Sequence, residues 1–287
     1  MSSEAVTALI VITLAAAVVN GALGYGFSSI TVPLALLFVT NRVLNPALVP
    51  IEVALNAHVL WINRGSLPLV WRRVLPVVIG LAPGVAAGTL IVSRVDSGWL
   101  KLGTFAALLP LILAHAAGFR RPIRAERSAG LVFGAGLGTL YAVTTVSGPP
   151  LAVMLNNQGL AKQEFRAALG LIRLAESTLT AAAYAWAGLY SATSLGLIPL
   201  ILPGVLIGVP IGAALITRMS AETFRRLCMS FDAWIVGFGI STLLRGLGLV
   251  DGAIAFSVLG GVVIVDGWLL YRFFLGARGR QVAINAA

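Results

Sequence analysis

Two long apolar stretches are each interrupted by glycine, proline and hydroxyl residues, a combination that could bind an anion. The interruptions cover residues 20–29 and 141–150. We expect a new helix to begin just after each break, where unpaired N–H groups and a partial positive charge suit an oxyanion. The candidate substrate contacts at the breaks are Asn20, Gly24, Ser28, Ser29, Thr31, Thr144, Thr145, Ser147 and Gly148. Alternatively, the hydroxyls cap helices or bond to their own backbone.

Ionisable residues inside apolar segments are the second group of candidates, because each is costly in a membrane and needs a partner. Arg173 and Glu176 are three residues apart on one expected helix, so they can pair on one face. Alternatively, Arg173 reaches a central cavity and binds an anion through its guanidinium group. Glu52 and Asn56 share a face of the roughly equivalent helix in the first half, and Asn56 is a further candidate contact. Glu52 or Glu176 could carry a coupling proton or balance the charge of Arg173.

Metal and nucleophile chemistry find no support in the sequence. The chain has two histidines far apart and one cysteine, Cys228, which gives no zinc-ligand spacing and no internal disulfide. It contains no P-loop and no nucleophile elbow. We therefore expect neither an enzyme nor a cofactor.

The composition is that of a membrane protein. Of the 287 residues, 59% are hydrophobic and 10% are charged, whereas a soluble domain carries about 25% charged residues. Apolar runs of roughly 17 to 25 residues recur along the chain, as in a polytopic helical protein. The net charge of +10 could suggest nucleic acid, but the basic residues lie in short loops between apolar spans, as the positive-inside rule requires. The expected partner is therefore the bilayer and not nucleic acid.

Hydropathy divides the chain into two similar halves. Residues 1–118 form a first repeat, with a broken segment at 5–40 and spans at 47–62, 74–92 and 102–118. A basic connector, 119–128, which we expect to be cytoplasmic, leads to a second repeat, 129–245. This repeat has a broken segment at 129–158 and spans at 167–187, 196–216 and 228–245. Residues 253–275 form an additional C-terminal transmembrane helix. Because the N-terminus has no basic region, we expect the first apolar segment to be retained.

The basic residues predict how the broken segments cross the membrane. If each segment enters and returns to the same side as a re-entrant hairpin, fifteen of the 20 Lys and Arg residues lie on one side. The other side has only Arg42, Arg94, Lys101 and Arg245, and Arg173 lies within a span. This distribution follows the positive-inside rule. A hairpin plus three spans makes an odd number of crossings, so the repeats are inverted, with the N-terminus outside and the C-terminus cytoplasmic.

The repeat also shows in paired motifs. When the halves are aligned at an offset of 117, Gly21 matches Gly138 and Pro33 matches Pro150. At an offset of 124, the glycines of 84–88 match those of 208–212. Glycines four residues apart let two helix backbones approach closely. We expect these pairs to serve helix packing.

Residues 147–167 carry a family resemblance. Their Ser147-Gly-Pro-Pro150, followed by Gln158-Gly159 and Phe165-Arg166, resembles the second-half signature of the sulfite exporter TauE/SafE family. The pattern Gly21-x-x-Gly24-x-Gly26…Pro33 is similar to that family's N-terminal signature. The resemblance implies a bacterial inner-membrane transporter of sulfite, sulfonates or related anions. Where the family is often glycine-rich, this chain reads Val-Thr-Thr-Val-Ser at residues 143–147.

We therefore expect an all-α secondary transporter that exports a small sulfur-containing oxyanion by alternating access about a midplane site between the breaks. An anion channel that uses the breaks as a filter is one alternative. A permease for another small organic anion, such as a carboxylate, is another. The sequence is also compatible with a homodimer.

Overall fold

The computed structural model describes residues 3–23, 25–117, 127–156, 160, 162–215 and 221–285, and every regular element in these ranges is a helix. The first half contains α1 (Ser3–Leu23), α2 (Phe27–Ala35), α3 (Asn41–Ile62), the 3₁₀ turn η1 (Arg64–Ser66), α4 (Leu67–Arg94) and α5 (Ser97–Ala116). The second half contains α6 (Arg127–Thr144), α7 (Gly148–Asn156), α8 (Lys162–Trp186), α9 (Ala192–Leu215) and α10 (Ala221–Gly246). The 3₁₀ turn η2 (Gly252–Phe256) leads into α11 (Ser257–Asn285). Residues 119–126 of the predicted connector lie outside the described residues. Its last two residues, Arg127 and Ser128, begin α6.

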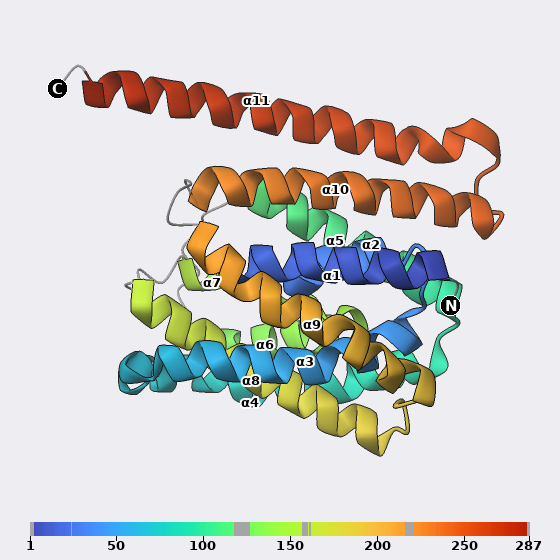
Figure 1. The fold of residues 1–287 in the computed structure, drawn as a ribbon, viewed down its shortest axis with the longest axis horizontal. Helices are drawn as coiled ribbons and strands as arrows, with labels where there is room; N and C mark the ends of the chain where they lie inside the picture. The colour runs from blue at the N-terminus through green and yellow to red at the C-terminus, as the bar shows by residue number, and fades with distance from the viewer. Residues whose placement is uncertain are drawn as a thin grey trace.

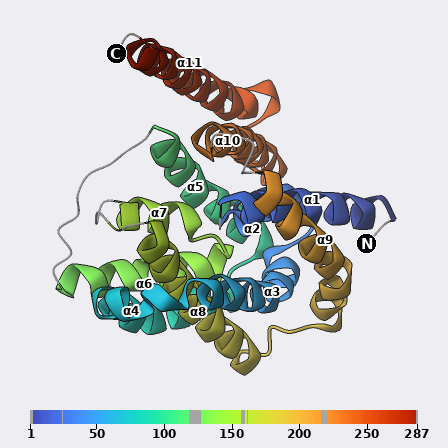
Figure 2. The ribbon, with the colours of Figure 1, turned by 60° about the vertical axis from the view of Figure 1, so that its left-hand side comes forward.

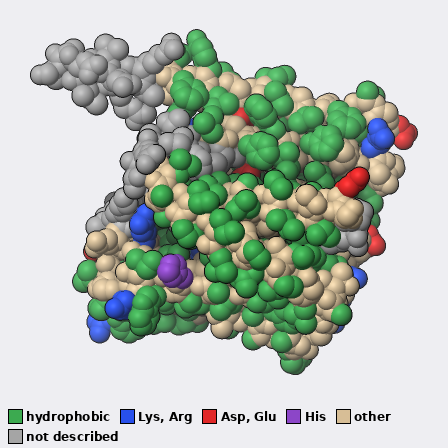
Figure 3. Space-filling model, viewed as in Figure 1, with side chains coloured by type: hydrophobic (Ala, Val, Ile, Leu, Met, Phe, Trp, Pro, Cys, Tyr) green, Lys and Arg blue, Asp and Glu red, His purple; other side chains and the backbone are tan. Residues whose placement is uncertain are grey.

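The prediction of an all-helical, multi-pass membrane protein is confirmed. Within the described ranges, six helical segments are long and apolar enough to cross a membrane. Helices α8 and α10 match them in length but are less apolar. Figure 1 shows most of the long helices running along the long axis, with the N and C labels at opposite ends. In Figure 3, hydrophobic side chains cover the visible flank, and charged side chains lie mainly toward the two ends.

Helix α3 extends beyond the apolar span predicted for it, and a basic residue in its first turn is hydrogen-bonded. The predicted span 47–62 lies inside α3, which begins six residues earlier. Near that start, the Arg42 guanidinium group donates to the carbonyl oxygens of Val92, Ser93 and Val95 at 2.8 to 3.0 Å. These carbonyls belong to the C-terminal end of α4, where unpaired acceptors favour a cation. Arg42 thus links the first turn of α3 to the C-terminal end of α4.

Each broken segment consists of one long and one short helix. α1 has 21 residues and α6 has 18, which correspond to roughly 27 to 32 Å at 1.5 Å per residue. α2 and α7 have nine residues each, or roughly 13 Å. The first arm of each segment is therefore close to a full span, whereas the second is a half-length helix.

The principal helix contacts join the two halves of the chain. α1 packs against α9, α4 packs against α6, and α3 packs against α8. At Gly84 of α4, an added Cβ would overlap the carbonyl oxygen of Ala135 on α6. At Gly212 of α9, it would overlap the carbonyl oxygen of Val18 on α1. The glycine pairs therefore serve close helix packing, as predicted.

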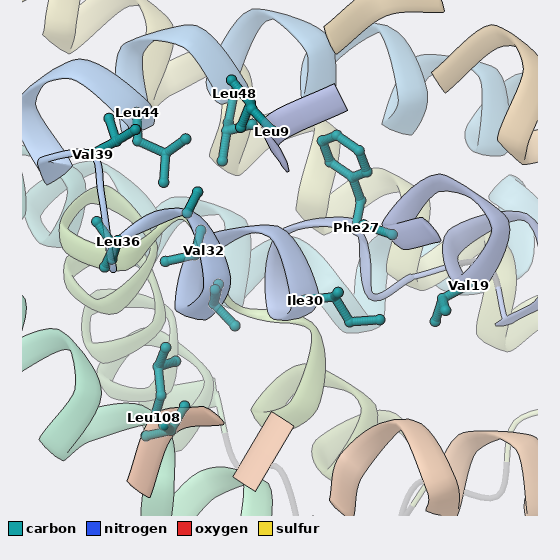
Figure 4. Close-up of a cluster of buried hydrophobic side chains, with 14 of the residues drawn as sticks. Leu9, Val19, Phe27, Ile30, Val32, Leu36, Val39, Leu44, Leu48 and Leu108 are labelled. Carbon is teal, nitrogen blue, oxygen red and sulfur yellow. The ribbon is translucent and has the colours of Figure 1, made fainter. Parts of the chain in front are cut away.

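A hydrophobic cluster anchors the short helix α2 in the interior. Phe27 and Val32 of α2 are fully buried, and they pack in one cluster with Leu44 and Leu48 of α3 and Leu9 of α1. Figure 4 shows these side chains around the α2 backbone. Because the apolar side of α2 is fixed in this way, the polar residues in its first turns are held in the interior.

The last helix, α11, lies at the edge of the molecule. Figures 1 and 2 both place it beyond α10. The Arg226 guanidinium group on α10 forms an ion pair with Asp266 of α11, with Nη2 at 2.8 Å from Oδ1. Arg226 also donates to Ser230 at 2.9 Å. This buried pair fixes α11 to α10, away from the two breaks.

Candidate functional site

The centre of the candidate site is the carboxylate of Glu52, which is buried midway along α3. Nη2 of Arg173, on α8, lies 3.1 Å from each of its two oxygens. The Tyr141 hydroxyl of α6 donates to Oε2 at 2.8 Å, and the Ser28 hydroxyl of α2 donates to Oε1. Both carboxylate oxygens therefore accept hydrogen bonds from a neutral hydroxyl group and from the charged guanidinium group. Glu52 links the first break to the second half of the chain.

A second serine–glutamate pair lies at the other break. Ser147, directly before α7, donates to Oε2 of Glu176 on α8 at 2.5 Å, and both residues are fully buried. The other oxygen of Glu176, Oε1, has no hydrogen-bond partner among the described residues. Glu176 lies within electrostatic reach of Arg173 and Glu52. The two breaks thus each contribute a serine that bonds to a carboxylate.

The two glutamates are related by a repeat offset, whereas Ser28 and Ser147 are 119 positions apart. Glu52 and Glu176 are 124 positions apart, the offset that also relates the glycines of α4 and α9. At this offset, Val49 corresponds to Arg173. Val49 is fully buried and packs with Tyr141. The cation is therefore a feature of the second half alone.

Arg173 pairs across helices and not along its own helix. The sequence spacing suggested that Arg173 pairs with Glu176 on one helical face. The ion pair in the structure instead joins Arg173 to Glu52. Asn56 of α3 donates from Nδ2 to the Arg173 carbonyl oxygen at 3.4 Å. Nε of Arg173 is buried and has no hydrogen-bond partner among the described residues. The guanidinium group therefore retains an unused donor beside its carboxylate.

The threonines of the second break bond locally. The Thr144 hydroxyl donates to the Leu140 carbonyl at 2.7 Å and accepts from the Val146 N–H at 3.0 Å. The Thr145 hydroxyl donates to the Thr144 carbonyl at 2.7 Å. Thr145 also has a positive φ of 55°, which is uncommon for a β-branched residue. These hydroxyls shape the break through their own backbone, as the alternative interpretation expects.

The remaining candidates lie around the first break. Gly24 falls outside the described residues. Asn20, Ser29 and Thr31 are buried, and the Thr31 hydroxyl oxygen has no hydrogen-bond partner among the described residues. Their burial places them in the interior without assigning them a ligand.

The two breaks meet in space. A Cβ added to Gly148, at the start of α7, would lie 3.3 Å from Cδ2 of the Tyr25 ring. Tyr25 belongs to the short connection between α1 and α2. The absence of a side chain at Gly148 therefore lets the second break approach the first.

A polar cavity lies at one end of the α3–α8 contact. It has a volume of about 520 Å³ and is lined by Ile62, Asn63, Gly65, Ser66, Gln163 and Arg166. Arg166 precedes Arg173 by seven residues on α8, so the two lie on one face two helical turns apart. Between them, a Cβ added to Gly170 would lie 3.1 Å from the Leu60 backbone nitrogen. The α3–α8 contact thus separates the cavity from the buried ion pair.

Tyr141 is the residue that sequence reasoning missed. It is the first residue of the second break, but it is not among the candidate contacts. The available signal was its phenol, because a buried tyrosine hydroxyl usually needs a hydrogen-bond partner.

For metals, the described residues contain no group of three or more His, Cys, Asp or Glu side chains that could hold an ion.

Comparison with known proteins gives one result. The family model for the sulfite exporter TauE/SafE matches residues 9–238, a range that runs from α1 into α10. No curated protein and no solved structure matches the chain. The matched range contains both breaks and both serine–glutamate pairs, and the family is one of transporters. Since this match covers most of the chain, the protein belongs to the sulfite exporter TauE/SafE family.

Proposed function

We propose that this chain is a secondary transporter that exports a small sulfur-containing oxyanion, either sulfite or an organosulfonate. The observation that carries the proposal is the position of Arg173, a buried cation between two breaks that each supply a serine. A planar guanidinium group presents several N–H donors in a fixed geometry that suits an oxyanion. The family match agrees with this class of substrate.

The short helices supply a second source of positive potential. α2 begins at Phe27 and α7 at Gly148, each next to a serine that is bonded to a site carboxylate. The N-terminus of a helix carries a partial positive charge and unpaired N–H groups. An anion at Arg173 would therefore be close to the N-terminal ends of helices from both halves, with Ser28 and Ser147 as additional donors.

Alternating access would change the packing between the halves. The contacts of α1 with α9 and of α4 with α6 are of the kind expected if two inverted repeats exchange their helices. The cavity beside Arg166 would be the cytoplasmic approach to Arg173, with the α3–α8 contact as the barrier. If the packing opened on one side of the membrane while it closed on the other, the site would be exposed to the two sides in turn.

The proposed orientation places the N-terminus outside and the C-terminus in the cytoplasm of a bacterial inner membrane. Arg64, Arg72 and Arg166 then lie on the cytoplasmic side, in accord with the positive-inside rule. An inside-negative potential would favour export by about 2.3 kcal/mol per 100 mV for each net negative charge that crosses, counting any proton that accompanies the anion.

Transport by reconstituted protein tests the proposal. Proteoliposomes loaded with labelled sulfite or with a labelled sulfonate should release it only when they contain the protein. Arg173→Ala should reduce binding roughly ten- to hundredfold, because a hydrogen bond to a charged group contributes about 1.5–3 kcal/mol. Ser147→Ala should also reduce it, by a smaller factor.

A matched control separates the site from the general effect of altering a buried arginine. Arg173→Lys keeps the charge but removes the guanidinium geometry, so it should impair transport. Arg226→Lys makes the same change in the equally buried α10–α11 ion pair, so it should leave transport near the wild-type level. Unchanged transport in both Arg173→Ala and Ser147→Ala would show that the anion binds elsewhere.

A further inference from the structure

We propose that the site takes up a proton together with each anion, and that Glu52 is the group that receives this proton. The inference rests on the proposed function, because it describes what must happen when an anion reaches Arg173. It follows from the hydrogen bonds and the charges around Glu52 and identifies the coupling ion as H⁺.

The first step is that Glu52 already occupies the place of an anion. Both of its oxygens lie 3.1 Å from Nη2 of Arg173, and the two side chains are almost fully buried. A substrate that uses the same donors must displace the carboxylate. Glu52 therefore acts as an internal competitor for the guanidinium group.

The second step concerns charge. Among the described residues, the charged or titratable groups facing Glu52 are Arg173 and Glu176 of α8 and Tyr141 of α6. The cluster thus holds one cation and two carboxyl groups. A further anion would leave the displaced Glu52 carboxylate without its cation, and an unpaired buried charge is strongly unfavourable.

A proton on Glu52 removes this difficulty. In the empty site, Glu52 is ionised and paired with Arg173. In the loaded site, the anion pairs with Arg173, and Glu52 becomes a neutral carboxylic acid with the proton on one oxygen. The hydroxyl groups of Ser28 and Tyr141 donate to Glu52 in the empty site, and the oxygen of either one can accept a hydrogen bond from this acid. The net charge of the cluster is therefore the same before and after the anion and the proton bind.

Glu176 differs from Glu52 in its surroundings. Its hydrogen bond comes from Ser147, and the ion pair of Arg173 is formed with Glu52. An anion at Arg173 would therefore not take a charged donor away from Glu176. This assigns the exchangeable proton to the first half and leaves Glu176 as the corresponding carboxyl group for comparison.

The test is the number of protons taken up when an anion binds. Methanesulfonate is a suitable probe, because its charge does not change with pH in the neutral range. Titration calorimetry of the purified full chain in buffers with different ionisation enthalpies should give roughly one proton per anion near neutral pH. Where Glu52 is ionised in the empty site, the affinity should weaken about tenfold for each unit of rising pH.

Variants show which group takes the proton. Glu52→Gln mimics the neutral acid, so it should bind methanesulfonate without proton uptake and with little dependence on pH. Glu176→Gln should keep the proton uptake, whatever its affinity. Asp232→Asn, which changes a buried carboxyl group on α10, should behave like the wild type.

The outcomes separate this inference from the proposed function. Anion binding by the wild type without proton uptake, or uptake that persists in Glu52→Gln, would overturn the role of Glu52 and leave the anion site in place. Failure of methanesulfonate, sulfite and other sulfonates to bind at any pH would overturn the proposed function itself. If Glu52→Gln does not fold, the absence of proton uptake by the wild type, or its loss in Glu176→Gln, would still overturn the role of Glu52.

Discussion

At the scale of single residues, the buried ion pair of Glu52 and Arg173 is the most consequential feature. A buried pair contributes little net stability when compared with apolar residues of similar volume, because both charges lose their hydration. Removing one partner is different, since the other charge stays buried without compensation. The pair is therefore better explained by function than by stability, and its partners should be strongly coupled energetically.

A double-mutant cycle measures this coupling. Glu52→Ala leaves Arg173 without its anion and should lower the free energy of unfolding by about 3–5 kcal/mol. Adding Arg173→Met removes the stranded charge, so the double variant should be more stable than Glu52→Ala alone. Thermal unfolding of the detergent-solubilised protein, followed by tryptophan fluorescence, gives the comparison. Additive effects of the two substitutions would mean that the pair is not coupled.

The sequence predicted the members of the cluster better than their pairing. Ser28, Glu52, Ser147, Arg173 and Glu176 were all candidates, because polar and ionisable residues are costly inside apolar segments. Their partners depend on how α3 crosses α8, which no local pattern encodes. The sequence spacing suggested a pair within α8, whereas the cross-helix contact gave Arg173 a nearer carboxylate.

At the scale of the elements, close helix contacts hold the two breaks together. The glycines of α4 and α9 remove side chains where the backbones of α6 and α1 pass. Close approach permits extensive van der Waals packing, which is the main source of helix association in a bilayer. The sequence predicted this role from the four-residue spacing. It did not predict the partner helices, because spacing alone does not show which surface is approached.

Substitution of one such glycine tests the contact. Gly84→Ala introduces a Cβ that overlaps the Ala135 carbonyl oxygen, and it should destabilise the protein by about 1–3 kcal/mol. Gly261→Ala is the matched control on α11, where an added Cβ meets nothing within 4 Å. This control should be neutral or slightly stabilising, since alanine favours a helix over glycine. Equal melting temperatures for the two variants would contradict the packing role of Gly84.

At the scale of the whole molecule, the turns between helices lie at two opposite ends. The η1 turn lies at one end of the molecule, and the connection between α8 and α9 lies at the other in Figure 1. The charge distribution predicted which loops are cytoplasmic, because basic side chains are retained on that side. The topology stays a prediction from the sequence, whereas the packing of one half on the other came only with the structure.

Labelling of single cysteines tests the orientation. In a Cys228→Ser background, Gly188→Cys places a thiol between α8 and α9, and Gly65→Cys places one in η1. An added Cβ meets nothing within 4 Å at either position, and the positive φ of 67° at Gly188 adds a backbone strain of roughly 1–2 kcal/mol for the cysteine. A membrane-impermeant maleimide should label Gly188→Cys in intact spheroplasts, and it should label Gly65→Cys only after permeabilisation. The reverse pattern would invert the proposed topology.

The absence of an arginine at position 49 limits how many ligands one molecule can hold. Both halves have the serine and the glutamate, but only the second has the cation, since Val49 stands where Arg173 would be repeated. If the anion binds at Arg173 as proposed, saturation should occur at one anion per polypeptide. Under the proposed inverted topology, the two sides of the membrane would meet chemically different half-sites, so the transport cycle need not run equally well in both directions.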